Sequence, residues 1–488
     1  MLKRLFDSFG WFFVLISGLL SACAIDDIGP TNRVWLQGTS PTISGGFQNA
    51  GTLLLESIDD AYDVDLTVPQ GAVTNLASGL IEFLGGAGGG RSFTADVINY
   101  GNFDASYGLV MTKTNGLFHQ RGLFNVATNI PCYYYCTNGY FFQEAGWLTI
   151  TGRFQMHQAT FVYSGGIITG EPLLVDAALQ LLSSATNEAS FQINATTSQL
   201  LGDVPGGQTV RILGSNENGP GYLTSTNGFR NEGVLYLDAT NAPFDAGLIV
   251  LAGAITNSTT GVIYSRAGPG GAREIQSDLF NAGQLINETA LTVKAPRAGV
   301  VNAGHMFLTS DQFLTLNSDF TQTASGTLKL ELSQPDPGFD TEFMTIGGTA
   351  ALDGQLVLAL KPDYTPLPGD SFRVLSCQRR VGYFNLTDVA SLPPGLAWKV
   401  DYRNNAVILS VNNKVQPPVV QEVTRVAGGS IHLTCTGTPS GALVLQSSPD
   451  FKSWSAVATN RPFRGLFEFT DSSTKTVAKR FYRAVAVP

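Results

Sequence analysis

The residues best suited to contact a ligand are three consecutive tyrosines, Tyr133, Tyr134 and Tyr135, which stand between Cys132 and Cys136. Rigid aromatic side chains offer large contact surfaces, including to the faces of sugar rings. A disulfide between the two cysteines would require a turn, because an extended strand holds residues four apart too far from each other. The segment is therefore predicted to be a loop with tyrosines at its tip, which contact a ligand or simply cover one flank of the fold.

The sequence contains no complete motif of established catalytic chemistry; Ser472–Lys475 matches S-x-x-K, but the companion motifs of that site are absent. None of its four histidines, His119, His157, His305 and His432, has the H-E-x-x-H spacing of a zinc hydrolase. The chain also lacks the G-x-S-x-G nucleophile elbow and the Walker phosphate loop. One close cysteine pair does not make a four-cysteine zinc site. The sequence therefore predicts no catalytic residue, no metal ligand and no cofactor.

Two segments are expected to be loops although their composition suggests binding. The densest acidic stretch contains Glu56, Asp59, Asp60, Asp63 and Asp65, and calcium prefers several carboxylates in one loop. Because the calcium-loop pattern itself is missing, a solvated acidic loop is the prediction. The glycine-rich run at residues 85–90 lacks the lysine and hydroxyl of a phosphate cradle, which predicts a flexible loop.

The composition limits the elements that can position these residues. Glycine supplies 54 of the 488 residues, and charged residues only 14%, against about 25% in an average protein. These values exclude a helical bundle, a coiled coil and a charged disordered chain. With 29 basic and 38 acidic residues the formal net charge is −9, so the chain has no cationic footprint for nucleic acid.

A repeat of roughly 22 residues supplies those elements. Ten glycines recur in two series, at positions 51, 79, 101, 122 and 146 and at positions 233, 261, 283, 304 and 326. An apolar residue follows two positions after every one of them: Leu53, Ile81, Phe103, Phe124, Leu148, Leu235, Ile263, Leu285, Met306 and Leu328. Apolar and polar residues then alternate, which is typical of a strand with one buried face. Each glycine is therefore predicted to open a strand.

Asparagine marks the bends between these strands. It stands two residues before the glycine at Asn49, Asn99, Asn231, Asn281 and Asn302, and both residue types tolerate the left-handed conformation of a sharp bend. Stacked rungs, spaced about 4.8 Å apart, would bury the apolar stripe and align the asparagines in a hydrogen-bonded ladder.

The predicted fold class is all-β, with a right-handed parallel β-helix of about thirteen rungs followed by a small C-terminal β-sandwich. An antiparallel sandwich or barrel is the competing architecture. Residues 150–225 fit the rungs least well, and residues 175–183 could form a helical turn. The predicted boundaries are 24–345 for the β-helix, 346–413 for its closing end, 414–419 for a linker and 420–488 for the sandwich.

The amino terminus has the composition of a targeting sequence. Residues 1–23 contain Lys3 and Arg4 before an apolar run, as in a secretory signal peptide. The end of this segment fits simple cleavage near Ala24, but Leu20–Cys23 also resembles the bacterial lipobox, which would make Cys23 the lipidated first residue. Export implies an oxidising compartment, in which cysteines can pair.

The rungs resemble the parallel β-helix repeats of bacterial autotransporter passengers and adhesin-like surface proteins, and residues 317–411 resemble the stretch that closes such a helix. Residues 446–454, 467–471 and 480–483 resemble an immunoglobulin or fibronectin type III-like module of exported bacterial proteins. In that module Trp454 is expected to anchor the core, and Cys435 is expected to be free or paired with Cys377.

These features favour an exported, non-catalytic structural or binding protein, adhesin-like, which displays loops from a rod outside the cell or at the bacterial outer surface. Its expected partners are a polysaccharide or a cell-surface protein, with a membrane contacted only through a lipid anchor. The alternative is a polysaccharide lyase or glycosidase on the same scaffold. Such an enzyme needs paired carboxylates, or a base beside carboxylate-neutralising groups, on one outer sheet face.

Overall fold

The computed structural model describes residues 5–6, 12–16, 25–239, 243–309, 313–335, 341–414, 417–438, 441–461, 463–476 and 479–487. The predicted lipidation residue Cys23 and the cleavage site beside it lie outside these residues. The chain forms two compact units: the first comprises residues 1–365, 371–391 and 400–409, and the second comprises residues 366–370, 392–399 and 410–488. The described residues contain no helix with the length and apolarity that a membrane crossing requires.

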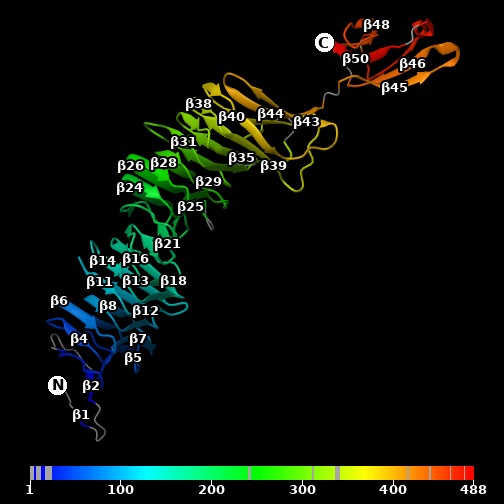
Figure 1. The fold of residues 1–488 in the computed structure, drawn as a ribbon. Coiled ribbons are helices and arrows are strands. Elements are labelled where there is room, and N and C mark those ends of the chain that lie inside the picture. The colour runs from blue at the N-terminus through cyan, green and yellow to red at the C-terminus, as the bar shows by residue number, and fades with distance from the viewer. Residues whose placement is uncertain are drawn as a thin grey trace. The chain divides into compact units, whose positions relative to one another are not determined.

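The first unit is a parallel β-solenoid of about 13 turns with about 23 residues in each turn. Figure 1 shows its strands stacked from blue to yellow. This confirms the predicted parallel β-helix, and it excludes the competing sandwich for this part of the chain. Residues 175–183, where a helical turn was considered, instead contribute to the short strands β19 (Leu173–Val175) and β20 (Ala178–Leu181).

One ladder of parallel strands covers the amino-terminal turns. Its members are β2 (Phe12–Ile16), β3 (Arg33–Gln37), β5 (Thr52–Ser57), β7 (Leu80–Gly86), β9 (Asn102–Ala105), β12 (Leu123–Val126), β15 (Trp147–Ile150) and β18 (Ile167–Thr169). The two-residue strand β1 (Leu5–Phe6) pairs antiparallel with β2.

A second parallel ladder carries the residues that precede the bends. It contains β4 (Phe47–Asn49), β6 (Val64–Asn75), β8 (Arg91–Asn99), β11 (Leu117–Gln120), β14 (Tyr140–Gln143), β17 (Thr160–Tyr163), β20, β22 (Ser198–Leu200), β24 (Gly221–Asn231), β26 (Ala246–Asn257), β28 (Arg273–Asn281), β31 (Val300–Asn302), β34 (Phe320–Gln322), β38 (Thr349–Leu352) and β41 (Arg379–Gly382).

A third parallel ladder starts on the first half of β8. It continues through β10 (Leu109–Thr112), β13 (Pro131–Tyr135), β16 (Arg153–His157), β19, β21 (Ala189–Asn194), β23 (Gln208–Leu213), β25 (Val234–Asp238), β27 (Val262–Ser265), β29 (Gln284–Asn287), β32 (His305–Thr309), β35 (Thr327–Leu332), β39 (Gln355–Leu360) and β42 (Asn385–Val389). A branch from β28 runs through β30 (Leu291–Val293), β33 (Leu314–Leu316), β37 (Met344–Ile346) and β40 (Ser371–Ser376), with β36 (Thr341–Glu342) beside β40, and β43 (Leu396–Tyr402) and β44 (Ala406–Asn413) follow.

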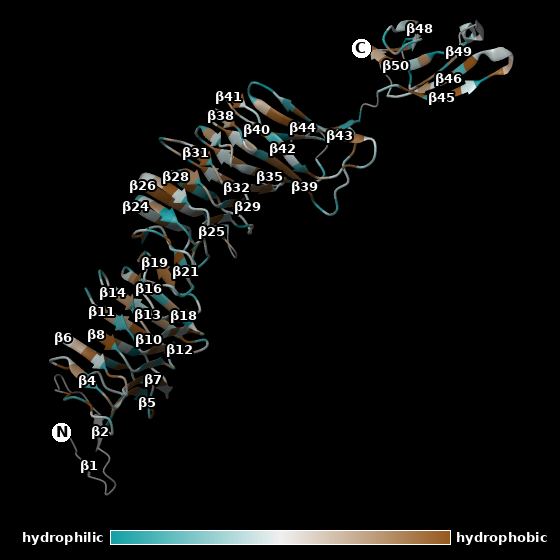
Figure 2. Ribbon diagram, viewed as in Figure 1, coloured by the Kyte–Doolittle hydropathy of each residue, from teal (hydrophilic) through white to brown (hydrophobic). Residues whose placement is uncertain are grey.

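The interior of the solenoid is filled by the apolar side chains that follow the bends. All ten of the predicted core residues have 0% exposure, and each of the ten glycines directly precedes a strand. Aromatic rings contact one another from turn to turn in tilted or edge-to-face arrangements, as between Phe83 and Phe103 at 5.2 Å and between Phe103 and Phe124 at 4.8 Å. Figure 2 shows hydrophobic and hydrophilic residues alternating along the strands. The alternation in the sequence is therefore the alternation between core and surface.

The predicted amide ladder is confirmed, and it occurs twice. In the first copy, the side-chain amides of Asn49, Asn75 and Asn99 each donate a 2.8 Å hydrogen bond to the side chain one turn further on, and the ladder ends at Gln120. The second copy runs through Asn231, Asn257, Asn281, Asn302 and Gln322, with bonds of 2.7–3.2 Å. All of these side chains are buried, so the amide groups satisfy one another where water cannot reach.

The two ladders belong to an internal repeat with an offset of 182 residues, which relates Asn49 to Asn231 and Arg91 to Arg273. Strands β6 and β26 both have twelve residues with three exposed ones at the centre, and β8 and β28 both have nine. Residues 150–225 lie between the two copies. The poor fit of this region to the rung pattern therefore reflects the join between two repeats.

The second unit contains two three-stranded antiparallel sheets. One has the order β45 (Val419–Arg425), β46 (Ile431–Thr436) and β49 (Leu466–Asp471), and the other has the order β48 (Ser455–Asn460), β47 (Ala442–Ser448) and β50 (Phe481–Val487). Short 3-10 helices span Ala427–Gly429 and Ser472–Thr476.

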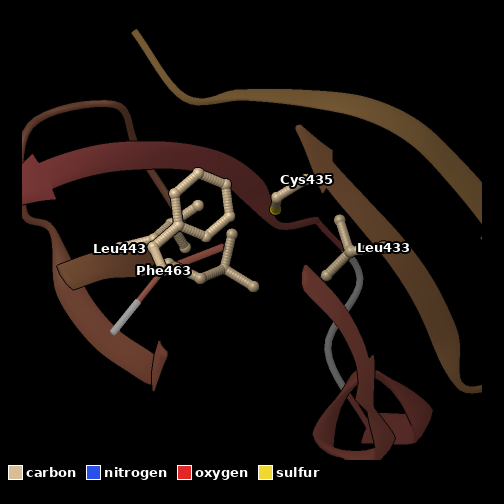
Figure 3. Packing of buried hydrophobic residues seen from close by; sticks show 5 residues of the cluster. Leu433, Cys435, Leu443 and Phe463 are labelled. Atoms are coloured by element: carbon tan, nitrogen blue, oxygen red, sulfur yellow. The ribbon is translucent and has the colours of Figure 1, made fainter. Parts of the chain in front are cut away.

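The core of these two sheets is built around Leu433, Cys435, Leu443, Leu445 and Phe463 (Figure 3). The prediction that Trp454 anchors this core is wrong. Its indole is only partly buried, donates to the Phe451 carbonyl at 3.1 Å and lies 4.3 Å from the guanidinium of Arg483. The ring of Phe463, which is 1% exposed, occupies the core instead.

Candidate functional site

The three tyrosines lie on a strand and not at a loop tip. Strand β13 pairs in parallel register with β10 and β16, so Tyr133 and Tyr135 point outward while Tyr134 points inward. Tyr134 is 2% exposed, and its hydroxyl donates to the Tyr140 carbonyl at 2.9 Å. The predicted loop is thus wrong, because the segment between the bends is long enough for an ordinary turn of the solenoid.

The Cys132–Cys136 disulfide is not formed. Both cysteines are free and buried, and the intervening residues are extended, which is the geometry that forbids a bridge between them. Burial raises the pKa of both thiols, so they stay protonated and unreactive. Cys377 and Cys435 are also free.

The outward tyrosines belong to a continuous strip of rings on the third ladder. Tyr133 and Tyr135 stack at 5.6 Å, and the Tyr135 ring lies 4.5 Å from His157 of the next turn. Tyr135 is 42% exposed. We call Tyr133, Tyr135 and His157 the aromatic strip. His157 was not singled out from the sequence, but its distance from Tyr135 is one repeat length, which is the signal that could have placed it there.

A similar group of rings lies on the second ladder. Tyr140 and Phe142 stack at 5.5 Å along β14, and Phe142 stacks on His119 of the preceding turn at 4.6 Å. The imidazole Nδ1 of His119 lies 3.2 Å from the carboxylate of Glu144. Burial would raise the pKa of Glu144, but hydrogen bonds from Arg121 and His119 outweigh it and lower this pKa. The group therefore combines outward rings with a carboxylate whose charge is balanced by Arg121.

A groove of about 650 Å³ lies beside the aromatic strip and includes one of its members. Its walls are formed by Tyr107, Tyr133, Leu109 and the acidic residues Asp63 and Asp65. We call it the Tyr107–Tyr133 groove. Asp65 accepts hydrogen bonds from Ser92 at 2.6 Å and from Ser40 at 2.9 Å, and Asp63 accepts one from the Gly90 amide at 2.5 Å. Hydrogen bonds from neighbouring turns thus position these two carboxylates, and residues 58–63 are exposed and lie outside the strands, as predicted for a solvated loop.

The floor of the groove is shaped by a buried arginine. Arg91 is 1% exposed, and its guanidinium donates to four carbonyl oxygens of residues 84–90, among them Leu84 at 2.8 Å and Gly88 at 3.0 Å. The Tyr107 ring lies 5.1 Å from the guanidinium carbon. Although burial lowers the pKa of Arg91, a guanidinium remains charged. The glycine-rich loop is therefore tied to one cation, and Arg273 makes the same kind of contact in the second repeat.

An outer row on the first ladder brings two carboxylates together. Glu82 of β7 stands beside Asp104 of β9 in register, and Asp104 stands beside Asn125 of β12. Burial and the neighbouring Asp104 raise the pKa of Glu82, whereas Asp104 accepts hydrogen bonds from Ser106 at 3.0 Å and Asn125 at 3.1 Å. The sequence alone did not show this pairing, because the rung register was needed to align the two residues.

Comparison with known proteins adds no family to this geometry. No protein-family model matches the chain, and no curated protein is significantly similar to it. Within the described residues, no three His, Cys, Asp or Glu side chains gather in an arrangement that could hold a metal ion. The exposed aromatic residues and the Tyr107–Tyr133 groove are therefore the features that bear most directly on function.

Proposed function

We propose that this chain is an exported, non-catalytic structural and binding protein that contacts polysaccharide through the Tyr107–Tyr133 groove and the adjacent aromatic strip. The observation that carries the proposal is the run of outward rings next to a groove with two positioned carboxylates. Aromatic faces pack against the C–H faces of sugar rings, and carboxylates accept hydrogen bonds from sugar hydroxyls. A parallel solenoid repeats these groups at about 4.8 Å intervals, which suits an extended polymer.

Replacement of Tyr133 and Tyr135 tests the binding surface. The double variant Tyr133→Ala/Tyr135→Ala is expected to bind a polysaccharide ligand at least about fivefold more weakly, because each lost aromatic contact is worth roughly 0.5–1.5 kcal/mol. Binding is measured by glycan array and then by calorimetry with the full chain. Phe280→Ala is the matched control, since Phe280 is also 42% exposed but lies in the second repeat. Equal affinity of the double variant and the control would contradict the proposal.

Export and anchoring are part of the same proposal. The apolar run after Lys3 and Arg4 supports a cleaved leader, and the resemblance to autotransporter passengers and adhesins supports a surface or extracellular location. The separate resemblance of residues 446–454, 467–471 and 480–483 supports an immunoglobulin-like or fibronectin-like identity for the C-terminal sheets. Mass spectrometry of the mature amino terminus tests the proposed export and anchoring. A lipid-modified Cys23 indicates a tethered protein, and a start near Ala24 or Ile25 indicates a released one. Retention of residues 1–23 contradicts export through this leader.

The Glu82–Asp104 pair favours a polysaccharide lyase or glycosidase as the second candidate. A carboxyl group with a raised pKa beside a second carboxyl group is the arrangement that general acid catalysis of glycoside cleavage uses. Incubation of the full chain with acidic and neutral polysaccharides separates the two candidates. Release of shorter products that stops in Glu82→Gln would establish the enzyme, and retention without cleavage would support the binding protein.

A further inference from the structure

The C-terminal module differs in charge from the rest of the chain. Residues 420–488 contain eight Lys and Arg against four Asp and Glu, although the whole chain has a net charge of −9. The module therefore has a net positive charge, whereas the chain as a whole is negatively charged. This asymmetry is independent of the Tyr107–Tyr133 groove, which lies in the first unit.

The module contains a groove of about 520 Å³ between strand β45 and the beginning of β50. Its apolar wall includes Val420, Val423, Ile431 and Phe481, and its cationic side chains include Arg425 and Lys479. Strand β45 is an edge strand, and Val423 is 55% exposed on it. The groove is thus open to solvent and is lined by both apolar and cationic side chains.

The cations of this groove differ in their partners. Arg480 lies 3.2 Å from the carboxylate of Asp471 and also donates to Ser473, so its charge is balanced. Within the described residues, Arg425 and Lys479 form no ion pair. The ammonium group of Lys479 lies 5.0 Å from the centre of the Phe481 ring. Two cations are therefore available for an anionic ligand.

Aromatic and cationic side chains continue along the same strand. Lys479, Phe481 and Arg483 follow one another at every second residue toward and along β50, so they share one face. Arg483 covers Trp454, and Phe451, which is 61% exposed, packs on Phe481. A polymer of negatively charged sugar rings would contact aromatic and cationic side chains in alternation along this face.

We propose that this groove, which we call the basic groove, binds an acidic polysaccharide. The carboxylate or sulfate groups of the polymer pair with Arg425 and Lys479, and a sugar ring packs on Phe481. A membrane surface would instead require a flat cationic face, whereas these cations surround a recess. The inference goes beyond the proposed function, because it assigns a second site with a different ligand chemistry to the other unit.

Charge reversal in the full chain tests this assignment. The variant Arg425→Glu/Lys479→Glu is expected to bind polygalacturonate and heparin at least tenfold more weakly in calorimetry, and added salt should weaken binding of the unmodified chain. Lys452→Glu/Arg464→Glu removes the same charge outside the groove and should retain most of the affinity. Circular dichroism verifies folding, and Arg425→Gln/Lys479→Gln replaces the reversal variant if that variant unfolds.

Several outcomes would overturn the proposal. They are equal loss in the two charge-reversal variants, a loss of dextran affinity in Arg425→Glu/Lys479→Glu as large as its loss of polygalacturonate affinity, or tighter binding to phosphatidylserine vesicles or to a single-stranded oligonucleotide than to the acidic polysaccharides. The Tyr133→Ala/Tyr135→Ala variant should bind polygalacturonate as the unmodified chain does. Failure of this proposal is therefore distinguishable from failure of the function proposed for the first unit.

Discussion

At the level of single residues, the glycines at the bends are required for space and not for backbone conformation. Only Gly146 of the ten has a left-handed φ, of 65°. A Cβ atom at Gly101 would lie 2.3 Å from the carbonyl oxygens of both Gly79 and Leu76. The sequence thus predicted the bend correctly but for a partly wrong reason, because a single sequence cannot show that the next turn packs directly against the glycine.

A substitution at one bend tests this explanation. Gly101→Ala is expected to lower the free energy of unfolding by about 3 kcal/mol, because the methyl group meets backbone atoms that cannot move separately. Gly45→Ala is the control, since no atom lies within 4 Å of its would-be Cβ, and it should be neutral or slightly stabilising. Chemical denaturation of both variants gives the comparison. An equal loss in the two would show that backbone entropy, and not contact with the previous turn, sets the requirement.

At the level of strands, alternation was predictable only where polar and apolar residues differ. The strands opened by the glycines at 79, 101, 122, 146 and 326 have a polar residue between two buried apolar ones, and they were located correctly. In β13 the outward Tyr133 and Tyr135 and the inward Tyr134 are the same residue type, so residue type does not indicate which of them faces inward. The Glu82–Asp104 and Tyr135–His157 neighbours each stand one repeat length apart in the sequence, but only the strand pairing shows that residues at this spacing lie side by side on adjacent turns. Trp454 was misplaced because the bulkiest aromatic residue was assumed to occupy the core.

Acid should loosen the end of strand β49. Burial would raise the pKa of Asp471, but hydrogen bonds from Ser473 and Tyr482 together with Arg480 outweigh it and lower this pKa below its usual 3.8. Since the folded pKa is the lower one, the stabilisation is complete above about pH 4 and is lost as the pH falls through the folded value.

Hydrogen exchange of β49 peptides in the full chain, corrected for the intrinsic pH dependence, measures this effect. Protection should fall below pH 4 in the unmodified chain, and Asp471→Asn should remove the pH dependence and reduce protection at neutral pH. Glu468→Gln on the same strand should retain both the pH dependence of protection and the protection at neutral pH. A pH profile unchanged by Asp471→Asn would contradict the assignment.

At the level of the whole molecule, the chain combines a duplicated solenoid with a small module of opposite charge. The two amide ladders occupy matching places in the repeats, with the side-chain acceptor oxygens of Asn49 and Asn231 unpaired at the start of each. The two glycine series in the sequence already carried this duplication. The charge asymmetry between the units was also present in the sequence. It indicates a binding site only together with the structure, which places Arg425 and Lys479 beside one groove.

The duplication predicts that the same substitution at equivalent positions of the two repeats lowers the free energy of unfolding by the same amount. Asn75→Ala and Asn257→Ala each leave one donor and one acceptor of neighbouring buried amides without a partner, so each should lower the free energy of unfolding by about 2–4 kcal/mol. Gln70→Ala, an exposed residue on the same strand as Asn75, should have little effect. Denaturation with a probe in each repeat measures the three variants. A difference larger than the spread between replicate measurements would show that the two copies are no longer energetically equivalent.

The parallel ladders also determine how the solenoid would respond to mechanical load. Hydrogen bonds between successive turns run along the direction in which the turns stack, so tension along that direction loads them one turn after another. With about 23 residues in each turn, peeling off one turn would lengthen the chain by roughly 75 Å, at about 3.4 Å for each extended residue. The first unit would then lengthen stepwise under force and rewind when released, as a molecular spring that absorbs a pull without losing all of its turns at once.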